Sequence, residues 1–437
     1  MEVKHIVFLG GSHYPDFSAV GYCAFQVQKV LTADMRVSSI SFRTQPHQAL
    51  HETICAIQIY RIETPHMRRL NAIKLKSGKL SNLLQYAYRI TGGAKRLLSP
   101  ESIDRQLVKA YLLQLNKLPS KPEAIVALVF PFESVIAAII YQRMNPSVKV
   151  IPYIFDDFVE SGSLHVLDLA RDLKRRRHLR LEQEMLERST VVLSMHPLED
   201  HFRRNFDQAL VEKIAFLEHP LLVRPHWRII KDRPNTIKMC YAGSLIKNVR
   251  EPDALVDLLG EIEVNSNVQA DFYVMGNASA KVPTKRLENA VQISNHGQVA
   301  KAVADAAVQH ADILINLGEA QGRQVSSKIF EYMASGKPVV HFAFKENDAV
   351  TKILCKYPLA ICLLMTKEKQ RDNARDLSRF IFQNSRSRMS FEEVLAIFPE
   401  ANPEVTASRI RNVVFDQEVT EYQQIKPYDP ASRGEMT

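Results

Sequence analysis

Residues 326–340 read SSKIFEYMASGKPVV, and this stretch decides the fold class. As a helix that begins near Ser326 or Ser327, it places apolar side chains on one face and polar side chains on the other. Gly336 falls where the end of a helix favours a left-handed residue, and Pro338 begins an apolar, strand-like run. A helix that leads through glycine into a buried strand is typical of α/β proteins.

Similar apolar runs of strand length recur along the chain and alternate with helical patterns. The expected strands are 5–9, 37–42, 56–62, 124–130, 148–155, 191–195, 237–242, 272–275, 313–317 and 338–342. Helical patterns include 21–31, 80–118 and 166–188. Near-continuous apolar strands between helices indicate parallel sheets covered on both faces.

A charged stretch with two prolines separates the strands into two sets. Residues 224–235 read RPHWRIIKDRPN and predict a linker. We therefore expect two doubly wound, Rossmann-like domains, 1–225 and 236–400, followed by a helix and tail at 401–437. Open α/β sheets bind ligands at the carboxyl ends of their strands, so two such domains predict a central cleft with a ligand in it.

The composition is that of an intracellular globular protein that prefers anionic partners. Hydrophobic residues make up 46% and charged residues 24% of the 437 positions, which excludes a wholly disordered chain. The five cysteines never form a Cys-x-x-Cys pair, which argues against a disulfide framework or a structural zinc. No secretory signal or clean membrane span is evident, so we expect a cytoplasmic protein. The net charge of +9 favours nucleotides, nucleic acid or an anionic bilayer.

Small residues at four strand ends suggest phosphate binding. Small side chains let backbone N–H groups approach an anion closely. Neither Gly-x-Gly-x-x-Gly after the first strand nor a Gly-x4-Gly-Lys-Ser/Thr loop occurs, so the dehydrogenase and P-loop fingerprints are absent. The strand-end loops contain Gly10 and Gly11, Gly243 and Ser244, Gly276 and Asn277, and residues 318–327.

The start of the 326–340 helix has the chemistry of a nucleotide site. Ser326, Ser327 and Lys328 suit a diphosphate, and Glu331, one turn further, can accept hydrogen bonds from a ribose diol. The alternative is a capped amphipathic helix whose polar face is in water.

Residues 326–340 closely resemble the nucleotide-sugar-binding motif of GT-B fold glycosyltransferases. The resemblance is to the family-4-like group, which is also called glycosyl transferases group 1. Flanking segments resemble the same family in order: IKMCYAGSL, DFYVMGNA, ISNHGQV and ADILINLG. The resemblance covers about 237–344, and the first domain only through its architecture and the Gly10-Gly11 loop. It implies that the second domain binds the donor nucleotide and the first binds the acceptor, with a final helix crossing back to the first domain.

The resemblance also implies roles for individual residues. Glu331 would hold the ribose hydroxyls, and the diphosphate would lie near Ser326, Ser327 and Lys328. The base would be flanked by Gly276, Asn277, His296 and Gly297, and the other donor-binding glycine loops would be those of Gly10, Gly11, Gly243 and Ser244.

The chain departs from the family pattern at the leaving-group site. The paired glutamates of the family, eight positions apart, would place an acid at 323, where this chain has Arg323; Glu319 is displaced. The cations that usually follow the first donor-domain glycine are shifted as well. The candidates for stabilising a departing diphosphate are Lys247, Arg250, Arg323 and Lys328, each of which also fits a solvated surface cation. Family members generally need no metal or cofactor, and no Asp-x-Asp triplet is present.

Acceptor-side candidates are fewer. Asp156 and Asp157 end a strand where the family often has a catalytic or sugar-contacting His or Asp, although they can instead cap the next helix. His13 is a candidate for contacting the donor sugar or the acceptor, and the alternative is an exposed surface residue with no role in binding. Glu319 is a candidate for holding sugar hydroxyls.

Two basic stretches bear on partners. They are 68–96 and 171–180, the latter reading RDLKRRRHLR. Many family members lie on the inner face of the membrane through such surfaces, while the alternative is a solvated helix face. No aromatic platform or recognised motif indicates nucleic-acid binding.

The resulting hypothesis is a metal-independent hexosyl- or related glycosyltransferase. It would move sugar from a UDP- or GDP-type donor to a glycan or lipid-linked acceptor in bacterial surface-polysaccharide synthesis, in the cytoplasm or peripherally on the membrane. The alternatives are a GT-B fold nucleotide-sugar epimerase and a catalytically silent GT-B subunit that binds nucleotide or glycan.

Overall fold

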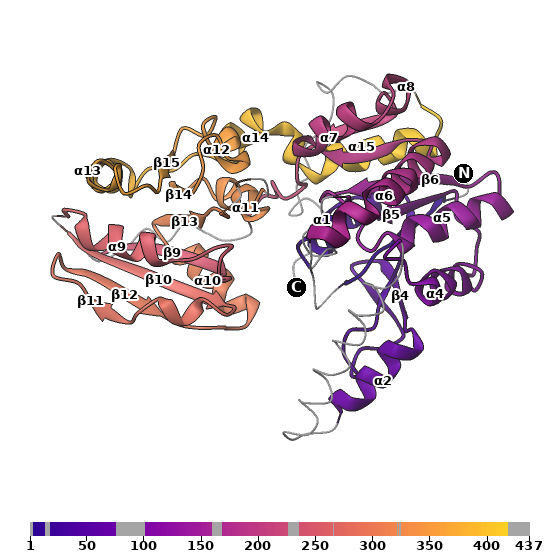
Figure 1. Cartoon of the computed structure of the whole chain (residues 1–437), viewed down its shortest axis with the longest axis horizontal. Helices are drawn as coiled ribbons and strands as arrows, with labels where there is room; N and C mark the ends of the chain where they lie inside the picture. Colours follow the sequence, from indigo (N-terminus) through magenta and orange to yellow (C-terminus); the bar gives the residue numbers. More distant parts are fainter. Residues whose placement is uncertain are drawn as a thin grey trace. The chain divides into compact units, whose positions relative to one another are not determined.

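The structure is a computed structural model of the chain, and its described residues form two compact units (Figure 1). Unit 1 runs to Pro220 and resumes at Pro403, and unit 2 spans Leu221–Asn402. The described residues are 3–13, 18–75, 101–159, 168–225, 236–264, 266–320, 322 and 325–417, with side chains omitted at 168–171. Most of the expected linker, the expected helical residues 80–100, most of the basic stretch 68–96, Arg323 and the tail lie outside them.

Unit 1 contains an eight-stranded sheet in the order β3-β4-β2-β1-β5-β6-β7-β8. All pairings are parallel except that of β3 with β4. The chain moves outward in one direction from β1 and then in the other from β5, so the topological switch point lies between these strands. The bounds are β1 His5–Leu9, β2 Arg36–Phe42, β3 His51–Ile54, β4 Ile57–Ile62, β5 Ala124–Leu128, β6 Lys149–Ile154, β7 Val192–Met195 and β8 Ile214–Leu217.

Helices cover this sheet, and the last one comes from the end of the chain. Figure 1 shows α15 in yellow among the indigo and magenta elements of unit 1, where it packs on α1 and β6. Arg411 pairs with Asp34 at 2.8 Å, and Lys149 donates to the Val413 carbonyl at 2.7 Å. The helices are α1 Ala19–Leu31, α2 Pro65–Lys74, α4 Arg105–Leu115, α5 Glu133–Met144, α6 Asp168–Arg188, α7 Glu199–Asn205, α8 Gln208–Val211 and α15 Pro403–Val414.

Unit 2 repeats the doubly wound plan with seven strands in the order β11-β12-β10-β9-β13-β14-β15. Here β11 is antiparallel and the other pairings are parallel, and the switch point lies between β9 and β13. The strands are β9 Thr236–Ser244, β10 Asn267–Met275, β11 Lys285–Arg286, β12 Val291–Asn295, β13 Ile313–Leu317, β14 Val339–Ala343 and β15 Ala360–Leu364.

The α-helices described in unit 2 have six to fifteen residues. They are α9 Asp253–Glu261, α10 Lys301–His310, α11 Lys328–Ala334, α12 Ala349–Leu354, α13 Gln370–Asn384 and α14 Phe391–Ile397. Every residue of β13 and β14 is buried, as expected for central strands covered on both faces. Within the described part of the chain, no helix combines the length and apolar character needed to cross a bilayer.

Candidate functional site

The loops after β9 and β10 are joined at the carboxyl edge of the unit 2 sheet. Leu245 N–H donates to the Met275 carbonyl at 2.8 Å, and Ala278 N–H donates back to the Leu245 carbonyl at 3.2 Å. Gly276 has a φ of +107°, and a Cβ there would lie 2.2 Å from the Leu245 oxygen. Only glycine allows this approach, so Gly276 sets the spacing of the two loops.

Side-chain and backbone bonds bring further predicted residues to this edge. The Lys247 N–H donates to Asn277 Oδ1 at 2.8 Å. The loop after β13 joins them because Ala320 N–H donates to the Val249 carbonyl at 2.7 Å. Glu319, in that loop, is 9% exposed. The structure thus gathers the loops after β9, β10 and β13 at the β9–β13 switch point.

The helix α11 has the limits expected from the sequence. Ser327 is its N-cap residue and makes no side-chain capping bond, and Gly336 follows the helix with a φ of +67°. A Cβ on Gly336 would lie 1.9 Å from the Met389 carbonyl oxygen, which explains the glycine. Ser326 and Ser327 are half-buried at the start of the helix.

Lys328 and Glu331 give this edge its charge. The Lys328 amine donates a hydrogen bond to the Ala242 carbonyl, near the end of β9. Burial lowers the pKa of Lys328, and the positive charges of Lys301 and Arg250 lower it further. Burial raises the pKa of Glu331, against the opposing effect of Lys301 and Lys328. Among the described residues, no side chain hydrogen-bonds to the Glu331 carboxylate.

Arg250 is a further cation at this edge. Burial raises the pKa of Tyr241 to about 12, and the charge and hydrogen bond of Arg250 oppose that rise. Tyr241 donates from its hydroxyl to the Ser244 carbonyl at 3.0 Å, and a Cβ on Gly243 would lie 3.0 Å from that hydroxyl. The buried Nε of Arg250 has no hydrogen-bond partner among the described residues. Arg250 is therefore a candidate for binding an anion.

His296 and Gly297 lie beside β10, and the His296 side chain is engaged there. Its Nε2 is 2.8 Å from Asp271 Oδ1, and its ring stacks on Tyr273 at 4.4 Å between centroids. Gly297 accepts a backbone bond from Val274 at 2.9 Å. Both residues follow β12, beside the loop after β10.

In unit 1, the β1 loop uses its polar groups internally. Gly10 accepts from the Tyr111 hydroxyl at 2.7 Å, and Gly11 accepts from Phe42 N–H at 2.7 Å. His13 is 4% exposed, with Nε2 2.7 Å from Gln28 Oε1. Burial lowers the pKa of His13 to about 4, so the imidazole is neutral at pH 7. In this conformation His13 faces the protein interior and not the solvent.

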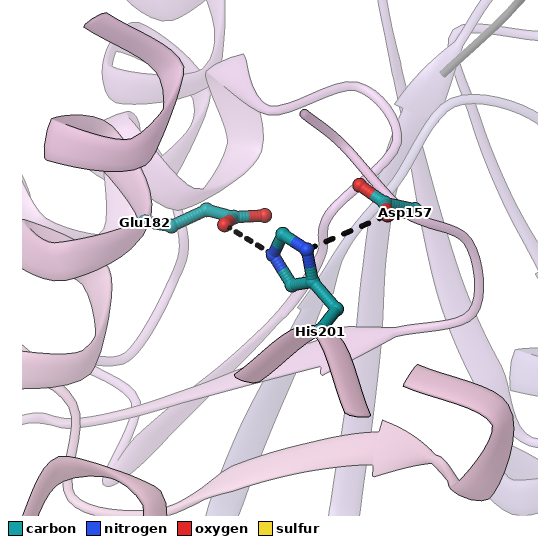
Figure 2. A group of neighbouring side chains, drawn as sticks. All are labelled: Asp157, Glu182 and His201. Atoms are coloured by element: carbon teal, nitrogen blue, oxygen red, sulfur yellow. Dashed lines mark hydrogen bonds and ion pairs between the residues drawn. The ribbon is translucent and has the colours of Figure 1, made fainter. Parts of the chain in front are cut away.

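The strand β6 ends at Ile154, and Asp156 and Asp157 come after the next residue, the buried Phe155. Asp157 joins a group that the sequence pattern does not indicate (Figure 2). His201 lies with Nε2 2.8 Å from Glu182 Oε2 and Nδ1 3.6 Å from Asp157 Oδ2. The strand end thus carries a polar cluster built from three separate elements.

Four residues of these two regions are absent from the expectations: Tyr241, Lys301, His201 and Glu182. For Tyr241, its position two residues before the strand-end glycine Gly243 is a usable signal. The other three come from helices whose sequence spacing to the site has no fixed value.

The basic segment 171–180 has two faces. Lys174 donates to Ser102 Oγ at 3.0 Å, and Arg175 donates to Asn205 Oδ1 at 3.2 Å, so these residues pair within unit 1. The other residues include an exposed set: Asp172, Leu173, Arg176, Arg177 and Arg180.

Solved structures of other proteins resemble this architecture over nearly the whole chain. Sucrose-phosphate synthase from Thermosynechococcus elongatus superposes with a TM-score of 0.60 at 14% identity, covering 94% of this chain and 98% of the other. The Anabaena protein HepE, in a complex with UDP and glucose, gives a TM-score of 0.58 at 12% identity over 94% and 100% of the two chains. The chain has the GT-B fold. The lipopolysaccharide outer core galactosyltransferase WaaB also matches, with a TM-score of 0.52 at 11% identity over 94% and 99%.

The predicted resemblance of the second domain to glycosyl transferases group 1 is confirmed over part of the chain. Residues 236–360 match the family model described as Glycosyl transferases group 1. This segment includes the loops after β9, β10 and β13 and the helix α11. The match supports a glycosyltransferase. No curated protein sequence matches the chain.

Proposed function

We propose that this GT-B protein transfers a hexosyl or related sugar from a nucleoside diphosphate donor, held by unit 2, to an acceptor held by unit 1. The observation that carries the proposal is the charge at the edge of the unit 2 sheet, where Lys301 and Lys328 act on Glu331. The charge of Arg250 acts on Lys328 at the same edge. A diphosphate leaving group needs fixed positive charge where negative charge develops, and these side chains supply it. Glu331 offers a carboxylate to the ribose hydroxyls.

We propose that the donor is a UDP- or GDP-type nucleotide sugar and that the transfer uses no metal or other cofactor. HepE was solved with UDP and glucose, which favours a uridine nucleotide as the first probe. The cations of this chain can neutralise the diphosphate in the role that a divalent ion has in other sugar transferases.

For the acceptor, we propose a glycan or lipid-linked saccharide of bacterial surface-polysaccharide synthesis, used in the cytoplasm at the membrane surface. The exposed face of α6 supports this location, since Arg176, Arg177 and Arg180 accompany Leu173, which is 72% exposed. Cationic faces with an apolar residue are attracted to anionic headgroups.

Thermal-shift binding of UDP, GDP, ADP, CMP and their sugar conjugates tests the donor site. A ligand at 100 times its Kd stabilises the native state by about 2.7 kcal/mol, which raises the melting temperature. We expect one nucleoside diphosphate to do so with wild type and to lose most of the effect with Glu331→Ala. Glu368→Ala, at an exposed position before α13, is the matched control.

Two outcomes contradict the proposal in different ways. If no nucleotide shifts the melt at millimolar concentration, unit 2 is not a donor site. If a nucleotide binds but no sugar reaches any acceptor, the silent-subunit alternative replaces the transferase, and interconversion of free nucleotide sugars indicates the epimerase.

A further inference from the structure

The cluster of Asp157, Glu182 and His201 is built from three elements of unit 1 (Figure 2). Asp157 follows β6, Glu182 lies on α6 and His201 lies on α7. The exposed fraction of the side chains rises along the row, from 2% at Glu182 through 10% at His201 to 25% at Asp157. The imidazole thus joins a buried carboxylate to a more exposed one.

The two carboxylates lie next to different nitrogens of the His201 ring. Glu182 Oε2 lies 2.8 Å from Nε2, within hydrogen-bond distance, while Asp157 Oδ2 lies 3.6 Å from Nδ1, within ion-pair distance. A single metal ion needs one ring nitrogen and both carboxylates pointing at one place. Here the ring stands between the carboxylates, so the arrangement favours a proton-bearing imidazole over a metal centre.

The surrounding charges favour the protonated ring. Arg175, on α6, acts on Glu182 and donates to Asn205 Oδ1 at 3.2 Å. Among the charges that the described side chains show here, two carboxylates outnumber one guanidinium, and an imidazolium offsets the difference. Burial raises the pKa of Glu182, while the hydrogen bond and charge of His201 lower it. An ionised buried carboxylate therefore gains most when the ring is positive.

One rival state is visible in the same contacts. The amide nitrogen of Asn205, on α7, lies 3.5 Å from His201 Nδ1 and also donates to the His201 carbonyl at 2.7 Å. A neutral ring can accept from this amide while donating to Glu182. Asp157 would then face a ring nitrogen without a proton. The protonation state of His201 decides between the two states.

We propose that His201 is held as an imidazolium between Glu182 and Asp157, and that His201 and Glu182 are positioning residues for Asp157. The clamp ties the loop of residues 155–159 to α6 and α7 and presents the Asp157 carboxylate at the strand edge as an anion. Such a carboxylate binds sugar hydroxyls through charge-assisted hydrogen bonds. The role of Asp157 toward an acceptor saccharide rests on the proposed function, whereas the clamp itself does not.

The clamp makes this loop sensitive to pH. When His201 loses its proton, the attraction to Asp157 ends, and the loop is held by its backbone contacts and by the packing of Phe155 and Phe158. Above the titration midpoint of His201, residues 155–159 therefore exchange amide hydrogens faster. A ring that is neutral throughout the neutral range gives no such dependence.

The test uses the full chain labelled in its histidine rings, with NMR titration of His201 assigned through His201→Asn. We expect the midpoint to fall by about one pH unit in Glu182→Gln and also in Asp157→Asn, because each change removes one opposite charge. Glu184→Gln is the control, since Glu184 lies on the same helix, is 45% exposed and pairs with Arg143. Hydrogen exchange of residues 155–159 should rise about tenfold in Glu182→Gln and stay at the wild-type rate in Glu184→Gln.

Unchanged midpoints in both variants, or a wild-type His201 that is neutral at pH 7, overturn the clamp. Zinc chloride that shifts the His201 signals at an equimolar ratio also overturns it, in favour of a metal site. The nucleotide thermal shift, measured on the same variants, is expected to stay at the wild-type value because the donor residues lie in unit 2. Failure of the proposed donor site is thus distinguished from failure of the clamp.

Discussion

The two units share one architecture, yet their strand edges carry opposite chemistry. At the edge of unit 2, the positive charges of Lys301 and Lys328 act on Glu331, and that of Arg250 acts on Lys328. Lys301 is also paired with Asp305 at 2.8 Å. At the edge of unit 1, the carboxylates of Asp157 and Glu182 lie beside His201. Both edges lie at or next to a topological switch point.

This difference shows that the doubly wound fold supplies the position of a site and not its chemistry. Parallel strands bring loop residues to one edge in each unit, and the side chains at that edge decide the ligand. Cations suit a diphosphate and carboxylates suit sugar hydroxyls, so the division of charge matches a division between donor and acceptor. Substitutions at each edge test whether that division is real.

The largest expected effect is at the close loop approach of unit 2. In Gly276→Ala the new Cβ would lie 2.2 Å from the Leu245 oxygen, at a φ of +107° that alanine rarely adopts. We expect a loss of about 2–4 kcal/mol in the free energy of unfolding of unit 2, with no nucleotide-induced rise in melting temperature. Calorimetry with and without the identified nucleotide measures both.

A second glycine in the same unit serves as the control. A Cβ on Gly260, in α9, would meet nothing within 4 Å. Gly260→Ala is expected to stabilise by about 0.5–1 kcal/mol, because glycine weakens a helix. A Gly276→Ala variant that melts and binds like wild type would show that the loops after β9 and β10 need no such spacing.

The next effect sharpens the cationic side of the comparison. Lys328→Ala removes an amine that lies at the end of β9, bonded to the Ala242 carbonyl. We expect the Kd of the nucleoside diphosphate to rise about 10- to 100-fold, since a hydrogen bond to a charged group is worth about 1.5–3 kcal/mol. The Kd of the nucleoside without phosphates is expected to stay unchanged. Isothermal titration calorimetry gives both constants.

Lys356→Ala, at an exposed position after α12, controls for the loss of a positive charge. Equal weakening of nucleoside and diphosphate in Lys328→Ala would place this amine away from the phosphates. In that case Arg250, whose buried Nε has no described partner, becomes the leading candidate for the leaving-group cation.

The central strands could be predicted from the sequence, and several edge strands could not. The expected strand 313–317 coincides with β13, and 148–155 contains β6. Five strands were not predicted: the four edge strands β3, β8, β11 and β15, and β12, which lies beside β11. None of the five is fully buried. An edge strand has one neighbour and partial cover, so its sequence lacks the continuous apolar run that marks a central strand.

The candidate donor site was predictable in its loops but not in its contacts. The glycine loops and the 326–340 motif are local features, so Gly276, Lys328 and Glu331 could be identified from the chain alone. The bond from Ala320 N–H to the Val249 carbonyl joins backbone groups and leaves no trace in side-chain identity. The roles of individual candidates stay predictions until the variants are measured.

Cluster residues in unit 1 were beyond prediction for a different reason. Asp157, Glu182 and His201 lie on three elements, and their contacts depend on how α6 and α7 pack on the sheet. No fixed spacing links them, and each alone has the pattern of a surface charge. Tertiary packing decides which charges become neighbours.

The smallest expected effect concerns buried histidines of unit 1. Burial lowers the pKa of His13 and of His219 to about 4 in each case. As the pH falls below 6.5, the unfolded chain takes up protons at these positions while the native state does not, so the native state loses stability until about pH 4. Between pH 6.5 and 5.5 the loss is about 1 kcal/mol for each histidine.

His13→Gln and His219→Gln should each reduce the fall in melting temperature over this interval, whereas His310→Gln, on the exposed end of α10, should leave it at the wild-type value. An equal fall in all three variants would mean that the acid sensitivity arises from other groups, and that the buried histidines of unit 1 do not distinguish its pH response from that of unit 2.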